Sequence, residues 1–232
     1  MRLRIGVICA IVLGIALAAG PLKADSVAIQ NASFETTNPL TFGGCGTGCA
    51  YNYGPIPDWT LNGTGGSFQP GPTYYTSIPD GTTVAFSSGG SISQVLGVSL
   101  LPDTTYSLSV DVGNRLDGFG SGTAYSIGLD AGSTLLNSIS GSNSTITPGT
   151  FQEETLTYTT GSTVTPGDLS IILGSGFGQS NFDDVRLTTS STSNSVSAPE
   201  PSGLLLLCMG LFCLALFVRR SRAKSQLSGA TS

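Results

Sequence analysis

Histidine is absent from the 232 residues of this chain. Its absence excludes Ser-His-Asp and Cys-His catalysis, histidine-ligated metals and histidine-based pH switches. Charged residues are also scarce, at 10% of the chain, against about 25% in an average soluble protein. Glycine, by contrast, occurs 32 times, about twice its usual frequency of roughly 7%. The composition therefore favours a turn-rich chain that works without histidine chemistry.

Positive charge is nearly missing from the middle of the chain. Residues 25–198 hold two cations, Arg115 and Arg186, against thirteen acids. The other cations lie in the two terminal segments. Because phosphate contacts need a surface of lysine and arginine, we do not expect this domain to bind nucleic acid.

The N-terminal segment has the pattern of an export signal. A short basic start at residues 1–4 precedes an uncharged apolar run at residues 5–19, and Ala24 follows as a small residue. This order predicts a signal peptide over residues 1–24 that signal peptidase removes. The alternative is an uncleaved membrane anchor, for which the apolar run is short.

A second apolar run, residues 203–218, lies near the C-terminus and carries no charge. It predicts one membrane helix. Arg219, Arg220 and Arg222 follow it directly. A cationic cluster stays on the cytoplasmic side of a membrane, so residues 225–232 are expected to form a cytoplasmic tail while the large middle segment lies outside.

The motif Pro199-Glu200-Pro201 stands just before this helix. The motif, the helix and the arginine cluster, in this order, resemble the PEP-CTERM sorting signal of exported proteins in biofilm-forming Gram-negative bacteria. The resemblance covers residues 198–224 and implies an exosortase as partner, with transient membrane anchoring and a final place at the cell surface or outside the cell. An ordinary C-terminal membrane anchor is the alternative.

The middle of the chain reads as one all-β domain. Tyr106, Leu108, Val110 and Val112 alternate with polar residues, which is typical of a half-buried strand. Further strand candidates are residues 82–86, 125–129, 156–158, 169–173 and 182–187. Turns containing Pro, Asp or Gly separate them. The pattern predicts a jelly-roll β-sandwich over residues 25–189, followed by a Ser/Thr linker at 190–197.

Four short motifs carry a second resemblance. They are residues 29–35, 56–59, 101–106 and 181–187. Their order is similar to that in galactose-binding-type jelly rolls, the fold of many carbohydrate-binding modules. The resemblance supports the fold more than any ligand, because a fold does not settle a function.

Cys45 and Cys49 are the only cysteines of the predicted exported domain. Two thiols in an oxidising compartment, separated by Gly-Thr-Gly, favour a local disulfide. A zinc half-site is the alternative, but the domain offers no other cysteine and no histidine to complete it.

Asp183 lies in the last predicted strand, and alternation places it on the same side as Val185 and Leu187. A carboxylate on an apolar face is costly unless it is paired, hydrogen-bonded or bound to a metal. Related jelly rolls often tie their first and last strands together through a structural calcium, and the matching positions here are Glu35 and Asp183. The alternative is that Asp183 accepts backbone N–H groups at a strand end without a metal.

Asn114, Arg115 and Asp117 end the clearest strand and enter a glycine-rich loop. An arginine between an amide and a carboxylate can grip sugar hydroxyls or a carboxylate, which makes these three residues candidates for ligand binding. The alternative is a structural ion pair of Arg115 with Asp117 or Asp111.

Aromatic residues are the remaining candidates for ligand contact. Trp59, the only tryptophan of the chain, is either a sugar platform or a core residue. Tyr51, Tyr53, Tyr74 and Tyr75 lie in predicted loops and are better placed for exposed stacking.

Adjacent carboxylates such as Glu153-Glu154 point to opposite faces of a strand, so they do not form a facing acid and base. We therefore predict a non-enzymatic, exported protein that binds glycan or forms part of the extracellular polysaccharide matrix. The alternatives are a carboxylate-based glycan-active enzyme and a purely structural or adhesive protein without a small ligand.

Overall fold

The computed structural model describes residues 24–42, 44–191 and 211. The expected signal peptide up to residue 23, the Pro199-Glu200-Pro201 motif and the arginine cluster lie outside the described residues. Of the expected membrane helix, Leu211 alone is described; it is helical and exposed. Within the described residues, no helix has the length and apolar character needed to cross a membrane.

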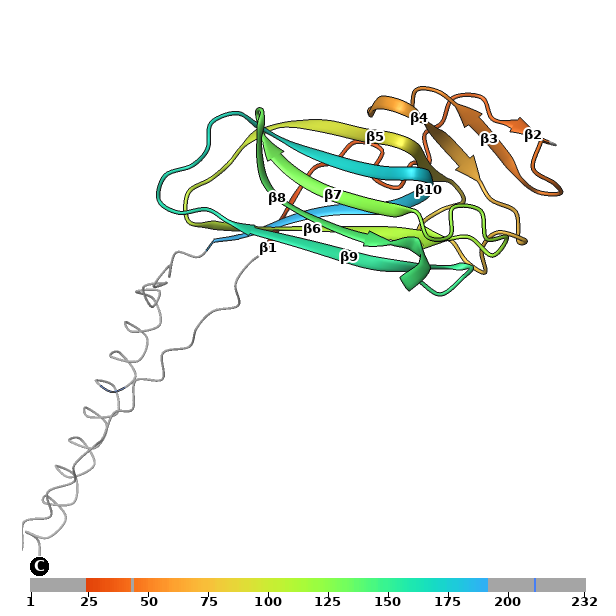
Figure 1. Ribbon diagram of the computed structural model, residues 1–232. Coiled ribbons are helices and arrows are strands. Elements are labelled where there is room, and N and C mark those ends of the chain that lie inside the picture. Colours follow the sequence, from red (N-terminus) through yellow and green to blue (C-terminus); the bar gives the residue numbers. More distant parts are fainter. Residues whose placement is uncertain (1–23, 43, 192–210, 212–232) are drawn as a thin grey trace, which may run out of the picture. The chain divides into compact units, whose positions relative to one another are not determined.

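Residues 24–191 form an all-β domain, as the sequence predicts (Figure 1). The strands are β1 (Ala24–Val27), β2 (Thr41–Phe42), β3 (Ala50–Tyr53), β4 (Thr60–Gln69), β5 (Val84–Ser99), β6 (Thr104–Asn114), β7 (Ala124–Ala131), β8 (Thr134–Ser142), β9 (Thr150–Thr159) and β10 (Asp168–Ser191), with a short 3-10 helix at Asn143–Thr145.

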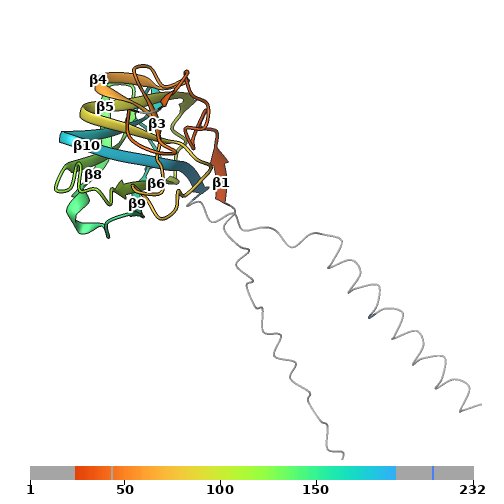
Figure 2. The same ribbon diagram turned by 90° about the vertical axis from the view of Figure 1, so that its right-hand side faces the viewer.

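Strand β10 organises the sheet because it has different partners along its length. Its first half pairs with β7, its second half pairs with β6, and β5 pairs with both halves. The strand order is β2-β3-β4-β5-β10-β6-β9, while β8 continues from β7 and β1 pairs with the end of β10 (Figure 2). The β7–β8 pair therefore faces the β6–β9 pair across the domain, as in a β-sandwich (Figure 1).

The main core fills the space between these strands. Leu108 of β6, Ile127 of β7, Leu156 of β9 and Ile171 of β10 are all buried in one hydrophobic cluster. Each such side chain stabilises the fold by about 1.5–3 kcal/mol when it is fully buried. The alternation seen in the sequence of β6 is confirmed, because its apolar residues all enter this core.

The sequence predicts two separate segments, 169–173 and 182–187, where the structure has the single 24-residue strand β10. A register shift between Ser175 and Gln179 separates the two apolar parts of this strand. Gly178 adopts a positive φ of 111° there, a conformation that glycine tolerates. The glycine-rich segment is thus an irregularity within a strand rather than a loop between strands.

Candidate functional site

Strand β5 separates two hydrophobic clusters. Ala85 faces the main core, while its neighbours Val84 and Phe86 face the opposite side of the sheet, as the alternation of a strand requires. On that opposite side a second cluster is formed by Cys49, Phe68, Tyr75, Val84 and Phe86. The candidate site lies on this second face.

A row of paired residues crosses six strands on this face. It consists of Tyr53, Gly66, Phe86, Asn181, Gly113 and Phe151, each directly opposite the next. Directly opposed residues share one face of a sheet. The row consists of three rings, two glycines and one amide, and at Gly113 the missing side chain leaves room for Tyr75, which arrives from a loop.

Gly113 shows why this room is needed. A Cβ atom at this position would lie 2.6 Å from Cε1 of Phe151 and 2.7 Å from the hydroxyl oxygen of Tyr75. Tyr75 packs against Phe151 with ring centroids 4.5 Å apart, and its hydroxyl accepts a hydrogen bond from Asn181 Nδ2 at 2.6 Å. Burial raises the pKa of Tyr75 far above its usual range, so its hydroxyl remains neutral.

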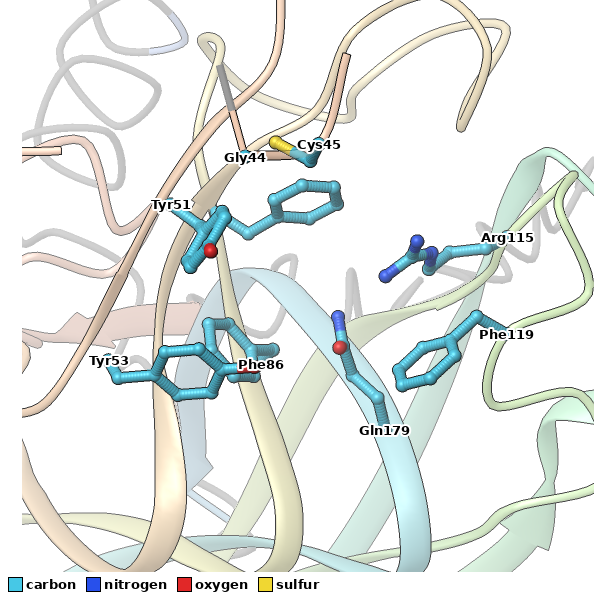
Figure 3. A pocket seen from close by; sticks show the side chains of 9 residues that line it. Gly44, Cys45, Tyr51, Tyr53, Phe86, Arg115, Phe119 and Gln179 are labelled. Carbon is cyan, nitrogen blue, oxygen red and sulfur yellow. The ribbon is translucent and has the colours of Figure 1, made fainter. Parts of the chain in front are cut away.

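Beside this row lies a pocket of about 200 Å³ (Figure 3). It is lined by Gly44, Cys45, Tyr51, Tyr53, Phe68, Phe86, Arg115, Phe119 and Gln179. Tyr51, Tyr53 and Phe86 form one side, and Arg115, Phe119 and Gln179 face them from the other (Figure 3). Five of these nine residues are aromatic, so the pocket suits a small, flat and largely apolar molecule.

Arg115 is the charged residue of the pocket lining. Its guanidinium lies over the rings of Phe68, Tyr74 and Phe119, at 5.2, 4.6 and 4.9 Å from their centroids. Asp117 accepts hydrogen bonds from Nε at 3.0 Å and from Nη2 at 2.5 Å. The predicted structural pair with Asp117 is therefore present, and the same arginine also lines the pocket.

The predicted disulfide between Cys45 and Cys49 is confirmed, so the zinc half-site does not form. Cys45 lines the pocket, and its carbonyl accepts a hydrogen bond from the hydroxyl of Tyr74, whose ring lies under Arg115. The closed loop thus supports one wall of the pocket.

Asn114 and Trp59, two further candidates from the sequence, do not line the pocket. Asn114 is buried and donates to the carbonyl of Ile146 at 2.8 Å. Trp59 is a core residue rather than a platform: it is buried, packs on Phe34 at 5.1 Å and donates to the carbonyl of Asn31. Among the four tyrosines, Tyr51 and Tyr53 line the pocket, while Tyr75 is buried beneath the site.

Asp183 is completely buried, but it does not share a face with Val185 and Leu187, so the face predicted from alternation is wrong. A β-bulge at Asp184, which has a φ of 44°, shifts the register between Asp183 and Arg186. The bulge turns Asp183 to the face opposite the main core. There it lies directly across from Asp111 in the register of β10 and β6.

The carboxylate of Asp183 accepts backbone N–H groups from Asp80 at 3.1 Å and from Asp184 at 2.8 Å. Burial raises its pKa to about 8. Glu35 approaches the same loop, where its Oε1 accepts the N–H groups of Thr82 and Thr83 at 2.8 and 2.7 Å.

Calcium takes six to eight oxygen ligands. Glu35 and Asp183 flank one loop, but both are already bonded to N–H donors. Among the described residues, no group of three or more Asp, Glu, Cys or His side chains gathers to hold a metal. These side chains alone do not make a calcium site, and the calcium prediction stays a prediction.

The fold and the pocket fit one family. The sequence profile of the HpiC1-like family, described as HpiC1 cyclase, matches residues 25–188. The chain therefore belongs to the HpiC1-like cyclase family. Among curated proteins, none matches the chain.

Solved cyclase structures from Fischerella sp. TAU are similar to this chain. The Stig cyclase Fisc, in complex with (3Z)-3-(1-methyl-2-pyrrolidinylidene)-3H-indole, is 26% identical with a TM-score of 0.60, and the match covers 74% of this chain and 100% of the cyclase. A cyclase in complex with 4-(1H-indol-3-yl)butan-2-one is 25% identical with a TM-score of 0.58, covering 73% of this chain and 99% of that one.

Jelly-roll carbohydrate-binding modules are also among the similar structures. One is the xylan-binding module CBM22-1 of Paenibacillus barcinonensis Xyn10C, which is 12% identical with a TM-score of 0.46. The match covers 74% of this chain and 99% of the module. Similarity at this level carries no information about a ligand.

The prediction of a non-enzymatic protein is wrong. The match to a cyclase family and the similarity to ligand-bound cyclases indicate an enzyme fold. Sequence reasoning looked for histidine or facing carboxylates, and the pocket is built instead from aromatic rings. Phe119 and Gln179 were missed; both stand in glycine-rich segments, where an isolated large side chain is the available signal.

Proposed function

We propose that this chain is an enzyme that binds a small aromatic molecule in the pocket and catalyses the formation of a new ring in that molecule. The observation that supports the proposal is the pocket itself, with aromatic side chains on both of its sides, in a member of a cyclase family. Indole-containing molecules occupy similar cyclases of Fischerella, so an indole is our first choice of ligand class.

Ring closure needs two ends of a flexible molecule to meet in the correct orientation. Enclosure between rigid aromatic walls supplies this by restricting the conformations of the bound molecule. The lining residues include neither Asp nor Glu, so the hydroxyls of Tyr51 and Tyr53 are the groups that can exchange a proton with the ligand. The amide of Gln179 can hold a polar atom of the ligand.

The direct test is calorimetric titration of the full chain with 4-(1H-indol-3-yl)butan-2-one. Tyr53→Ala and Phe119→Ala remove exposed rings from the two sides of the pocket, and each is expected to weaken binding about tenfold because stacking area is lost. Phe177→Ala removes a fully exposed ring outside the lining and serves as the control. Absence of binding, or equal effects of all three variants, would contradict the proposal.

Glycan binding is the second candidate function. Tyr53 and Phe119 are exposed at the pocket, and exposed rings are used as platforms for sugars. Titration with xylan- and galactan-derived oligosaccharides tests it, and binding that depends on the same two rings would favour it over the indole ligand.

We also propose that the protein is exported and sorted by an exosortase to the cell surface or the extracellular polysaccharide. The Cys45–Cys49 disulfide supports export, since disulfides persist in oxidising compartments. Intact mass of the protein from a host with and without an exosortase tests this: we expect loss of residues 1–24 in both and loss of the C-terminal helix only with the exosortase.

A further inference from the structure

Arg115 is an unexpected side chain in an otherwise neutral pocket. Residues 25–198 hold only two cations, and one of them lines the site. The side chain of Arg115 is 11% exposed. Removing a charge from water is costly, so a nearly enclosed guanidinium at an aromatic pocket needs a physical reason.

Arg186, the other cation, shows a different arrangement. Its guanidinium bridges Asp184 and Glu153 at the exposed surface, with one nitrogen donating to each carboxylate. Both of its ends are thus engaged by acids. Arg186 has the ordinary role of a surface cation in an acidic domain, and it provides a matched comparison for Arg115.

Asp117 occupies only one edge of the Arg115 guanidinium, through Nε and Nη2. Within residues 24–42 and 44–191, Nη1 has no hydrogen-bond partner, and the free end of the guanidinium points into the pocket (Figure 3). The three rings around it fix its orientation. The pocket therefore offers a positioned, unused donor edge.

The charge of Asp117 does not cancel this donor edge. Its side chain is 36% exposed, against 11% for Arg115, so water screens the carboxylate more than the guanidinium. The other lining residues carry no carboxylate. A ligand in the pocket consequently meets more positive than negative charge.

We infer that the pocket selects aromatic molecules that carry a carboxylate, with Arg115 as the residue that determines this specificity. The inference rests on the proposed function and names the substrate class of the same site. A carboxylate matches the planar donor edge of a guanidinium, and such charge-assisted bonds are about twice as strong as neutral ones. The rings hold the aromatic body while Nη1 and Nη2 donate to the acid group.

Calorimetry with three ligands that share one indole body tests the inference on the full chain. They are 4-(1H-indol-3-yl)butanoate, the neutral 4-(1H-indol-3-yl)butan-2-one and 4-(1H-indol-3-yl)butan-1-amine. We expect the carboxylate to bind at least tenfold more tightly than the ketone at low salt, and the amine to bind most weakly. Added salt should reduce the preference for the carboxylate.

Two variants separate recognition from a structural role. Arg115→Gln should reduce the ratio of carboxylate to ketone affinity to about one. Asp117→Asn should increase this ratio several-fold, because it removes the acceptor that competes for the guanidinium. A structural ion pair would instead make both variants weaken all ligands alike. Arg186→Gln, at the exposed cation, should leave the ratio unchanged.

Ketone binding without a preference for the carboxylate would overturn the inference and leave the proposed function standing. Tighter binding of the amine would overturn it as well, since it would show a negative rather than a positive pocket. Failure of all three ligands to bind would overturn the proposed function together with the inference.

Discussion

Asp183 is a carboxylic acid enclosed by protein atoms, and its pKa of about 8 lies far above the usual value near 3.9. Between about pH 4 and pH 8 the folded state keeps a proton that the unfolded state has released. The free energy of unfolding must then fall as the pH rises through this window. Burial is the main cause, and the two backbone N–H bonds oppose it only in part.

We expect the melting temperature of the calcium-free protein to decrease from pH 5 to pH 8, and Asp183→Asn to reduce this decrease. Asp111 and Asp130 also have raised pKa values through burial, so the comparison with the variant isolates Asp183. Scanning calorimetry in EGTA measures the effect. Equal pH dependence in both proteins would show that Asp183 does not cause the decrease. A rise in melting temperature at pH 8 on adding calcium would support a metal on the ionised carboxylate.

The variant Gly113→Ala tests whether this glycine makes room for Phe151 and Tyr75 on the second face of the sheet. Gly113→Ala places a methyl group against Phe151 and Tyr75 at less than 3 Å, so these rings must move. We expect a loss of about 1–3 kcal/mol in the free energy of unfolding, as for overpacked cores. Gly161→Ala is the control, because a Cβ there meets nothing within 4 Å. Urea unfolding of the two variants measures their free energies of unfolding. Similar values would show that the packing of Phe151 and Tyr75 does not require a glycine at position 113.

Single residues differ in how well the sequence predicts them. Cys45 and Cys49 are predicted because their pairing is local, and Trp59 is a core residue, one of the two alternatives that its motif leaves open. The face of Asp183 is not predicted, because one residue with a positive φ at Asp184 reverses the alternation that the argument used. A bulge leaves no distinctive signature in a sequence where many residues tolerate turns.

At the level of elements, the loop closed by the disulfide contributes Cys45 to the pocket lining. Cys45→Ser with Cys49→Ser removes a constraint on a short loop, worth about 2 kcal/mol in the chain-entropy estimate. Because the Cys45 carbonyl accepts from Tyr74 beneath Arg115, we also expect ligand affinity to fall several-fold through lost preorganisation. Titration with the indole ketone measures this affinity. Wild-type affinity in the double variant would show that the disulfide does not support ligand binding.

Strands were predicted well where they enter the main core and poorly where they change partners. The alternation in β6 is a local signal, while β10 pairs with β5, β6 and β7 along its length. The pocket depends on these non-local pairings, because β10 brings Gln179 between β5 and the end of β6. The spacing of residues within one strand does not show which residues of other strands will lie beside it.

At the scale of the whole molecule, the absence of histidine led to a wrong conclusion about function. It excludes a set of mechanisms, but it does not exclude catalysis by enclosure, in which aromatic walls hold a substrate in a reactive shape. The fold class could be read from alternation and turns. The class of activity could not, since a fold does not settle a function.

A crystal structure of the full chain with 4-(1H-indol-3-yl)butan-2-one would show whether the aromatic pocket beside β5 and β10 binds the ligand. We expect the indole ring between Phe86 and Phe119, with the ketone oxygen near Arg115 or Gln179. An indole bound elsewhere on the sandwich, with the pocket unchanged and filled only by water, would show that this pocket is not the binding site.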